Sequence, residues 1–343
     1  MLPLWTWGAE MSCDNDVKPR ARILAIAALL AALPVLFHVG VAIAQGSYPE
    51  KTIRIVNIGP AGGTADVLSR LIGEKLSASF GKPVIADPVP GAGGSLAAAQ
   101  VARAAPDGYT LFVSGDAALV TNISLYDKLA YDPVKDLAPV SQLVATPNLL
   151  VVSPEIPAAS VAELVALARS EPGKHTFAHG GLGFSTHLSG ELFKTMARLD
   201  IQHVMYRQSV LPDLLAGRVT MCFCNIAQVT PLVRDGKLRA LATTSPKRSS
   251  AAAEVATLSE SGFPGFDVTS WFALLAPSAT PQPIVDRLHQ ETVRILALPD
   301  IRQKLSDLGM EIVGSSPAEL AALIQTQTPQ RASLIKASGA KMQ

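Results

Sequence analysis

The hydrophobic residues of this chain fall into two kinds of pattern that alternate along its length. Short continuous apolar runs rich in β-branched residues predict buried strands, the clearest being residues 53–58, 109–114 and 149–152. Between them, apolar residues recur at three- and four-residue spacing and predict helices, the first of which begins at Thr64. Further strands are expected over residues 82–87, 176–179, 201–204, 219–223, 238–242 and 271–277, and further helices over residues 96–105, 160–169, 211–215, 281–297, 300–308 and 317–324 and from residue 185 onward. This succession predicts an α/β fold in which mainly parallel sheets are flanked by helices.

The first predicted strand leads through a glycine-rich loop, residues 59–63, into a helix start at Thr64. The first N–H groups of a helix lack partners within the helix and carry partial positive charge, so such a loop can receive an anion. Glycine also lets a ligand approach the backbone closely, and Thr64 and Asp66 offer side-chain oxygens for capping. Neither a nucleotide-binding P-loop nor a G-x-G-x-x-G motif is present here. The loop is therefore either a tight turn that holds nothing or part of an anion site.

Loops of small residues also follow the next two predicted strands, at residues 90–95 and 115–118. The carboxyl ends of parallel strands gather along one edge of a sheet, where ligands bind in α/β folds. Three convergent loops therefore favour a ligand site over empty turns. The same design returns at residues 176–187, where a strand enters another glycine-rich loop and another helix start.

Three polar residues in and after this later loop are candidates for contact with an anion. Ser185 is placed to cap the helix. His187 can donate a hydrogen bond to an anion, and a histidine satisfied by neighbouring backbone is the equal alternative. Arg207 is the one strong cationic candidate for a carboxylate clamp, although surface arginines usually have no such role.

Composition and charge narrow the classes of function. A chain of 343 residues with 48% hydrophobic residues is large enough for two domains with substantial cores. A net charge of +1 and an aromatic content of 5% argue against nucleic acid or an anionic membrane surface as a partner. No G-x-S-x-G elbow surrounds Ser185, and the sequence shows no paired carboxylates and no cluster of metal ligands. We therefore expect no enzymatic activity, no cofactor and no metal site.

Two of the three cysteines, Cys222 and Cys224, are separated by one residue in a predicted strand. Side chains two apart in a strand point to the same face, and a bridge between them is expected to be strained. The sequence therefore predicts free thiols in or near a core. A C-x-C pair without a second Cys/His cluster is weak support for a metal site.

The first 44 residues have the pattern of a secretory signal peptide. Basic residues between positions 18 and 22 precede an almost wholly apolar run over residues 23–44, and an Ala-Ile-Ala site predicts cleavage after Ala44. We expect export to the periplasm. Met11 is an alternative start, and a retained membrane anchor is the alternative to cleavage because the run is about long enough to span a bilayer.

Several stretches, in order along the chain, resemble the Bug solute-binding proteins of the tripartite tricarboxylate transporter system. They are residues 48–51, 62–66, 90–94, 105–111, 125–133, 185–193, 236–242 and 271–277. The resemblance covers residues 48 to about 340. It implies a non-catalytic, monomeric periplasmic binding protein of type II-like architecture, with two α/β domains joined by two crossovers. Domain one is expected at residues 46–146 plus 268–343, and domain two at residues 147–267.

The resemblance also implies a ligand and a site. The ligand is a small carboxylate, held in the cleft between the domains by backbone N–H groups, hydroxyls and waters more than by ion pairs, and delivered to the membrane subunits of the transporter. The ligand-binding residues it implies are Gly62, Gly63, Thr64 and Asp66 with Gly115, Asp116, Ala117 and Asn122 on one jaw, Ser185, Thr186 and His187 on the other, and also Tyr206, Arg207, Cys224 and Asn225.

This chain departs from the family pattern at two places. The stretch after Arg207 is about two residues shorter than in the family, and Cys224 stands where many members carry an aspartate. That aspartate is a natural partner for an amino group, so its absence argues against an amino-acid ligand and for a less polar acid. Two other functions are weighed against the transport receptor: a periplasmic sensor with the same cleft, and a hydrolase, which the absent nucleophile elbow disfavours.

Overall fold

The computed structural model describes residues 48–206 and 209–340. The expected signal peptide, its cleavage site after Ala44 and Arg207 lie outside the described residues. Among the described helices, none combines the length and apolar character needed to cross a membrane.

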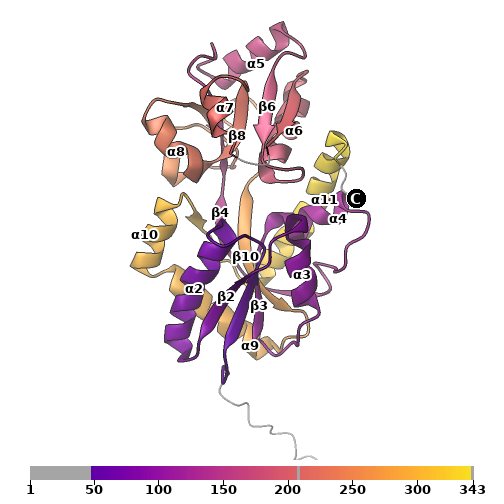
Figure 1. Cartoon of the computed structure of the whole chain (residues 1–343), viewed down its shortest axis with the longest axis vertical. Coiled ribbons are helices and arrows are strands. Elements are labelled where there is room, and N and C mark those ends of the chain that lie inside the picture. Colours follow the sequence, from indigo (N-terminus) through magenta and orange to yellow (C-terminus); the bar gives the residue numbers. More distant parts are fainter. Residues whose placement is uncertain (1–47, 207–208, 341–343) are drawn as a thin grey trace, which may run out of the picture. The chain divides into compact units, whose positions relative to one another are not determined.

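Two sheets organise the described chain, with helices beside each (Figure 1). The first has the strand order β11-β4-β10-β3-β1-β2. Its strands are β1 (Ile53–Asn57), β2 (Val84–Pro88), β3 (Thr110–Gly115), β4 (Leu137–Thr146), β10 (Ser270–Pro277) and β11 (Glu311–Ile312). The second has the order β7-β6-β8-β5-β9. Its strands are β5 (Asn148–Val152), β6 (Thr176–His179), β7 (Gln202–Met205), β8 (Met221–Asn225) and β9 (Arg239–Thr243).

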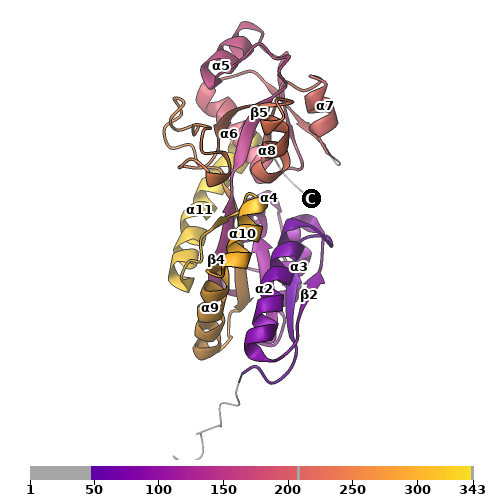
Figure 2. The same ribbon diagram turned by 90° about the vertical axis from the view of Figure 1, so that its left-hand side faces the viewer.

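Helices follow most strands, as the spacing of apolar residues predicts. They are α2 (Thr64–Phe80), α3 (Ser95–Ala102), α4 (Asn122–Leu125), α5 (Val161–Ser170), α6 (Ser185–Ala197), α7 (Leu211–Leu215), α8 (Ile226–Arg234), α9 (Gln282–Leu296), α10 (Pro299–Asp307) and α11 (Pro317–Ser338), with short helical turns η1 (Ala92–Gly94), η2 (Ala117–Thr121) and η3 (Ser250–Ala252). Figure 2 shows α9 and α11 running alongside β4, which both helices contact. The α/β class is confirmed.

The direction of the strands differs from the expectation, because both sheets are mixed and not mainly parallel. β1 pairs in parallel with β2 and β3, whereas β10 runs antiparallel to both β3 and β4. In the second sheet β6 has parallel neighbours and β5 has antiparallel ones. The cause is the path of the chain: β4 leads out of the first sheet and β10 leads back into it, so these adjacent strands run in opposite directions.

Several elements were not predicted from the sequence or extend beyond the prediction, among them β4, α8, α4, β11 and the second half of α11. α11 continues to Ser338 and not only to residue 324. Its start is fixed by a capping box, in which Ser316 Oγ accepts from the Glu319 N–H and the Glu319 carboxylate accepts from the Ser316 N–H. Beyond Pro329, the buried side chains of Arg331 and Ile335 hold the helix against the rest of the protein.

Each sheet has an apolar core. Phe112 and Trp271 belong to the core of the first sheet, where the indole N–H of Trp271 donates to Gln327 Oε1 at 2.8 Å. Phe177 and Phe193 belong to the core of the second sheet, which Ile335 of α11 also joins. These cores hold the carboxyl ends of β1, β3 and β6 in place. The loops that are expected to contact the ligand follow these three strands.

The distance between α6 and β6 depends on one glycine. Gly190 in α6 faces the Phe177 ring of β6 so closely that a Cβ atom at position 190 would overlap the ring. The helix can therefore lie close to the strand only because position 190 lacks a side chain.

Candidate functional site

A small cavity of about 210 Å³ lies where the loops after β1 and β3 meet the start of α6. It is lined by Ile58, Thr64, Gly115, Asp116, Ala117, Thr146, Asn148, Phe184, Ser185, Thr186, Asn225, Ser270 and Phe272. We call it the small cavity. Seven of the residues expected to bind the ligand are among these: Thr64, Gly115, Asp116, Ala117, Ser185, Thr186 and Asn225. The structure thus brings together loops that are more than a hundred residues apart in sequence.

Two long helices begin at the small cavity without a side-chain cap. The N-cap of α2 is Gly63, and the N-cap of α6 is Phe184; neither makes a side-chain capping hydrogen bond. Ser185 is thus the first residue of α6 and not its N-cap, which corrects the expectation. The first-turn N–H groups of both helices stay free of side-chain caps, so both starts offer donors and partial positive charge to an anion.

Two buried oxygens beside these helix starts have no hydrogen-bond partner among the described residues. They are Thr146 Oγ1 and Asn148 Oδ1. Both side chains are nearly inaccessible, at 2% and 1% exposure, and both line the small cavity. Leaving a buried polar atom unpaired costs about 1–3 kcal/mol, so these atoms indicate that the cavity receives a polar ligand or ordered water.

A buried ion pair lies beside the cavity wall. Asp116 accepts a hydrogen bond from Ser270 Oγ at 2.9 Å, and its other oxygen lies 3.7 Å from Arg331 Nη2 of α11. Arg331 also donates to the Thr269 carbonyl at 3.2 Å. Burial raises the pKa of the Asp116 carboxyl, against the opposing influence of Arg331 and Ser270. Arg331 therefore offsets a carboxylate that would otherwise repel an anionic ligand.

Four of the expected residues do not line the small cavity but belong to the loops beside it or hold these loops in place. They are Gly62, Gly63, Asp66 and Asn122. Asp66 is buried and holds the loop, because its carboxylate accepts from the Gly62 N–H at 2.9 Å and pairs with Arg70. Burial would raise the pKa of Asp66, but the hydrogen bonds from Arg70 and Gly62 lower it. Asn122 donates to the Gly93 carbonyl and to Ser95 Oγ, and so fixes the loop after β2.

His187 is also turned away from the small cavity. It is 1% exposed, and its Nδ1 accepts from the Gly183 N–H at 3.3 Å. Burial and the neighbouring histidines lower its pKa to about 3. The alternative weighed from sequence, a histidine satisfied by neighbouring backbone, describes this residue.

A second cavity of about 400 Å³ adjoins the first, and Phe184, Thr186 and Asn225 line both. Tyr206 and Cys224, two further expected residues, line this second cavity. The Tyr206 hydroxyl donates to Asp213 Oδ2 at 2.8 Å. The expected residues are thus divided between two adjoining spaces.

Cys222 and Cys224 form a disulfide, which corrects the prediction of free thiols. As expected from their spacing, both side chains lie buried on one side of β8. Their Cα atoms are 5.3 Å apart, closer than the roughly 6.6 Å spanned by two fully extended residues. This contraction of the strand brings the pair well within disulfide range.

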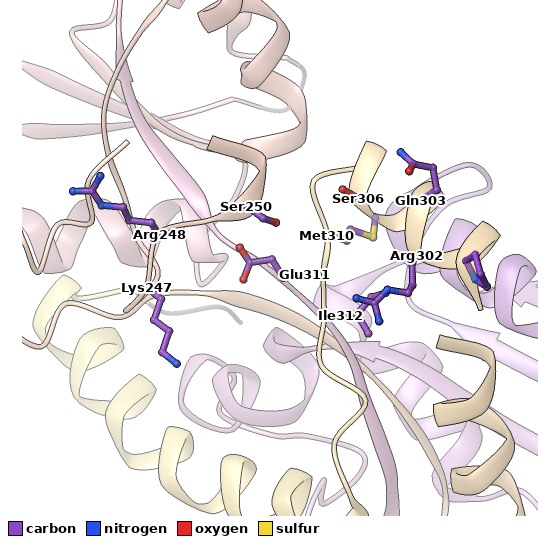
Figure 3. A pocket seen from close by; sticks show the side chains of 10 residues that line it. Lys247, Arg248, Ser250, Arg302, Gln303, Ser306, Met310, Glu311 and Ile312 are labelled. Atoms are coloured by element: carbon purple, nitrogen blue, oxygen red, sulfur yellow. The ribbon is translucent and has the colours of Figure 1, made fainter. Parts of the chain in front are cut away.

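A further cavity, of about 810 Å³ and so larger than these two, contains none of the expected residues. Figure 3 shows Lys247, Arg248 and Ser250 on one side of it and α10 on the other, with Glu311 between them. Arg248 is already paired with Glu260, at 3.0 Å. Size alone therefore does not identify the ligand site.

Sequence reasoning missed several residues of the small cavity. Asn148 carries a recognisable signal, since it is a polar residue at the start of an otherwise apolar strand. Thr146 ends β4, a strand that the sequence did not predict. Ser270 begins β10, whose start was predicted at residue 271. Arg331 gives no local signal, because only the packing of α11 brings it to Asp116.

Comparisons with known proteins find a matching family model and similar chains. The model of the tripartite tricarboxylate transporter family receptor (TctC) matches residues 68–340. The chain is 32% identical to protein BugT of Bordetella pertussis over 303 residues, which span 88% of this chain and 93% of BugT.

Two solved structures are similar over most of the chain. Rpa4515 of R. palustris with adipate has 34% identity and a TM-score of 0.76, over 86% of this chain and all of that one (100%). MatC of Rhodopseudomonas palustris with bound malate has 32% identity and a TM-score of 0.72, over 84% of this chain and 100% of that one.

Proposed function

The chain belongs to the receptor family of the tripartite tricarboxylate transporters, and from this premise we propose that it is a periplasmic receptor for a small organic acid. One observation carries the proposal: two long helices begin without a side-chain cap at one cavity, and two buried oxygens of this cavity have no hydrogen-bond partner in the described part of the chain. Helix starts and neutral polar groups hold a carboxylate without a cationic side chain. Adipate and malate in the two similar structures are acids of this class.

The residues that we assign to the ligand are those of the small cavity. Thr64 and the start of α2 hold it from the first sheet, and Ser185, Thr186 and the start of α6 hold it from the second. Asn148 and Asn225 supply amide groups. Asp116 stays paired with Arg331 and does not contact the carboxylate directly. The second cavity, which Cys224 lines, holds the remainder of a longer acid, and the absence of an aspartate at 224 disfavours an amino acid.

Delivery to transporter membrane subunits completes the proposed role. We infer a division into residues 46–146 plus 268–343 and residues 147–267, and two passages of the chain between the sheets, at residues 146–148 and 243–270, support it. A monomer that hinges at these passages closes when the ligand touches both halves. Export with cleavage after Ala44 places the mature chain in the periplasm, with no catalytic step and no cofactor required.

Thermal melting of the mature chain against a panel of mono-, di- and tricarboxylates tests this proposal. A ligand at one hundred times its Kd adds roughly 2.7 kcal/mol to the free energy of unfolding, enough to raise Tm by a few degrees. We expect dicarboxylates to raise Tm, S185A and T64V to reduce the shift, and S170A, a change on the exposed surface of α5, to leave it unchanged. Absence of any shift, with no organic acid released on denaturation and detected by mass spectrometry, would exclude a receptor for organic acids.

A further inference from the structure

Three of the six histidines of this chain meet in one cluster beside the second cavity. His179 ends β6, His187 lies in the first turn of α6, and His203 lies in β7. One ring nitrogen from each lies within 4.8 Å of the others, and the ring centroids are 4.6 to 5.5 Å apart. We propose that this cluster, the histidine cluster, binds a divalent transition-metal ion such as Zn²⁺. The sequence did not predict that these three side chains lie together.

The spacing suits a metal that prefers imidazole ligands. His179 Nε2 lies 3.0 Å from His203 Nδ1. Two nitrogens bound to one tetrahedral Zn²⁺ at about 2.0–2.1 Å are roughly 3.3 Å apart, so this pair needs only a small separation to admit the ion. Imidazole favours Zn²⁺, Cu²⁺ and Ni²⁺ over Mg²⁺ or Ca²⁺.

The cluster combines two fixed ligands with one that solvent reaches. His179 and His187 are each 1% exposed, whereas His203 is exposed. The neutral form of imidazole is the one that binds a metal. Glu191 Oε1 lies 3.9 Å from His187 Nε2, so a carboxyl group is next to the proposed ion.

Binding requires a change of tautomer in two rings. The Gly181 and Gly183 N–H groups donate to Nδ1 of His179 and His187, at 3.2 and 3.3 Å, so each Nε2 carries the proton. A metal at Nε2 displaces that proton, which moves through solvent to Nδ1, and the ring stays neutral. The two glycine N–H groups then lose their acceptor. Since they belong to the loop that leads to Phe184 and Ser185, we expect metal binding to move the loop.

The test uses the full mature chain without a polyhistidine tag, stripped with a chelator and kept oxidised so that Cys222 and Cys224 offer no thiolate. Zn²⁺ binding is measured by calorimetry, and Co²⁺ binding by its visible absorption. We expect one ion per chain. H203N should weaken binding at least tenfold, since even groups behind the ligands contribute 10–100-fold. H289N, the same change on α9 away from the cluster, should bind like the wild type.

Amide NMR supplies a readout that a surface ion would not produce. We expect Zn²⁺ to shift the Gly181 and Gly183 amide resonances in the wild type and in H289N, and not in H203N at the same concentration. Circular dichroism of each variant establishes that it is folded; because His203 is exposed, H203N tests the site without disturbing the core. Failure to bind one ion, or equal binding by folded H203N and wild type, would overturn the proposal and leave a cluster of packed rings.

Discussion

Asn148 donates a hydrogen bond from Nδ2 to Ser185 Oγ at 3.1 Å, which joins the first residue of β5 to the first residue of α6. With Nδ2 engaged, the amide presents Oδ1 to the small cavity as an acceptor that has no partner among residues 48–206 and 209–340. Only a donor satisfies that atom. A carboxylate has none, so the proposed ligand must bring a hydroxyl or a water to this position.

Hydroxy acids are therefore expected to bind more tightly than their deoxy counterparts. Malate should bind roughly two- to tenfold more tightly than succinate, because its hydroxyl adds one hydrogen bond and such a bond contributes about 0.5–1.5 kcal/mol to the binding free energy. Calorimetry with both acids measures the ratio. N148A should abolish the preference; a ratio that persists in folded N148A would place the hydroxyl elsewhere.

Thr146 and Thr280 form a matched pair for testing the cavity. Each carries a buried hydroxyl without a partner among the described residues, but only Thr146 lines the small cavity. We expect T146V to weaken binding of the best acid roughly two- to tenfold, through loss of one hydrogen bond, and T280V to leave affinity unchanged. Both should keep or slightly raise Tm. Equal affinities would remove Thr146 from the site.

Replacement of Asp66 tests how the glycine-rich loop is held. D66A leaves the Gly62 N–H and the Arg70 guanidinium without their acceptor, and should lower the free energy of unfolding by about 1–3 kcal/mol. Ligand affinity should fall as well, because this loop leads into α2. D132A is the control, since the Asp132 carboxylate also accepts backbone hydrogen bonds, from the Val134 and Lys135 N–H groups, away from the cavity. It should lower stability and leave affinity intact.

The effect of D66A should depend on pH in a defined direction. The pKa of Asp66 is lower in the folded chain than its ordinary value of 3.8. Its charge therefore stabilises the fold above that value and ceases to do so as pH falls through the folded pKa. The difference in unfolding free energy between wild type and D66A, from urea titrations, should be constant from pH 7 to 5 and shrink below 4. A difference that grows in acid would contradict the assigned hydrogen bonds.

Gly190 and Gly73 should respond oppositely to alanine. A Cβ at 190 overlaps the Phe177 ring, whereas one at 73 would lie 3.4 Å from Val84 Cγ1, an ordinary contact. G190A should destabilise the chain by about 1–3 kcal/mol through overpacking, despite the better helix propensity of alanine. G73A in α2 should be neutral or stabilise by up to about 1 kcal/mol. Equal Tm values for the two variants would show that α6 can move away from β6.

The sequence was informative where local chemistry decides the structure. β1, its loop and α2 lie where periodicity and glycines predict them, because strand propensity, turn residues and helix spacing are properties of adjacent residues. Strand direction was not predictable in this way, since β10 takes its direction from a passage between sheets. Arg331 was missed for a similar reason, because its partner Asp116 comes from a distant part of the chain. The histidine cluster lies within residues 179–203, but it forms only because β7 pairs with β6 in the folded sheet.

The Cys222–Cys224 pair shows a different limit of prediction from sequence. Their spacing correctly predicted one face of a strand, but whether they join depended on a contraction of β8 that residue types do not encode. In the same way, Ser185 was predicted as a cap because serine caps well, yet the chain turns one residue earlier, at Phe184.

The place of β10 in the first sheet has a consequence for the order in which the chain can assemble. β10 lies between β3 and β4, so that sheet stays split until residue 277 has emerged from the ribosome or the export channel. The second sheet uses only residues 148–243, a continuous stretch, and can be completed earlier. A chain that emerges N-terminus first can therefore complete the second sheet before the first sheet, although the first sheet contains the N-terminal strands. The last strands and α11 complete the first sheet and, through Arg331, one wall of the small cavity, so the receptor cannot capture a ligand until synthesis is nearly finished.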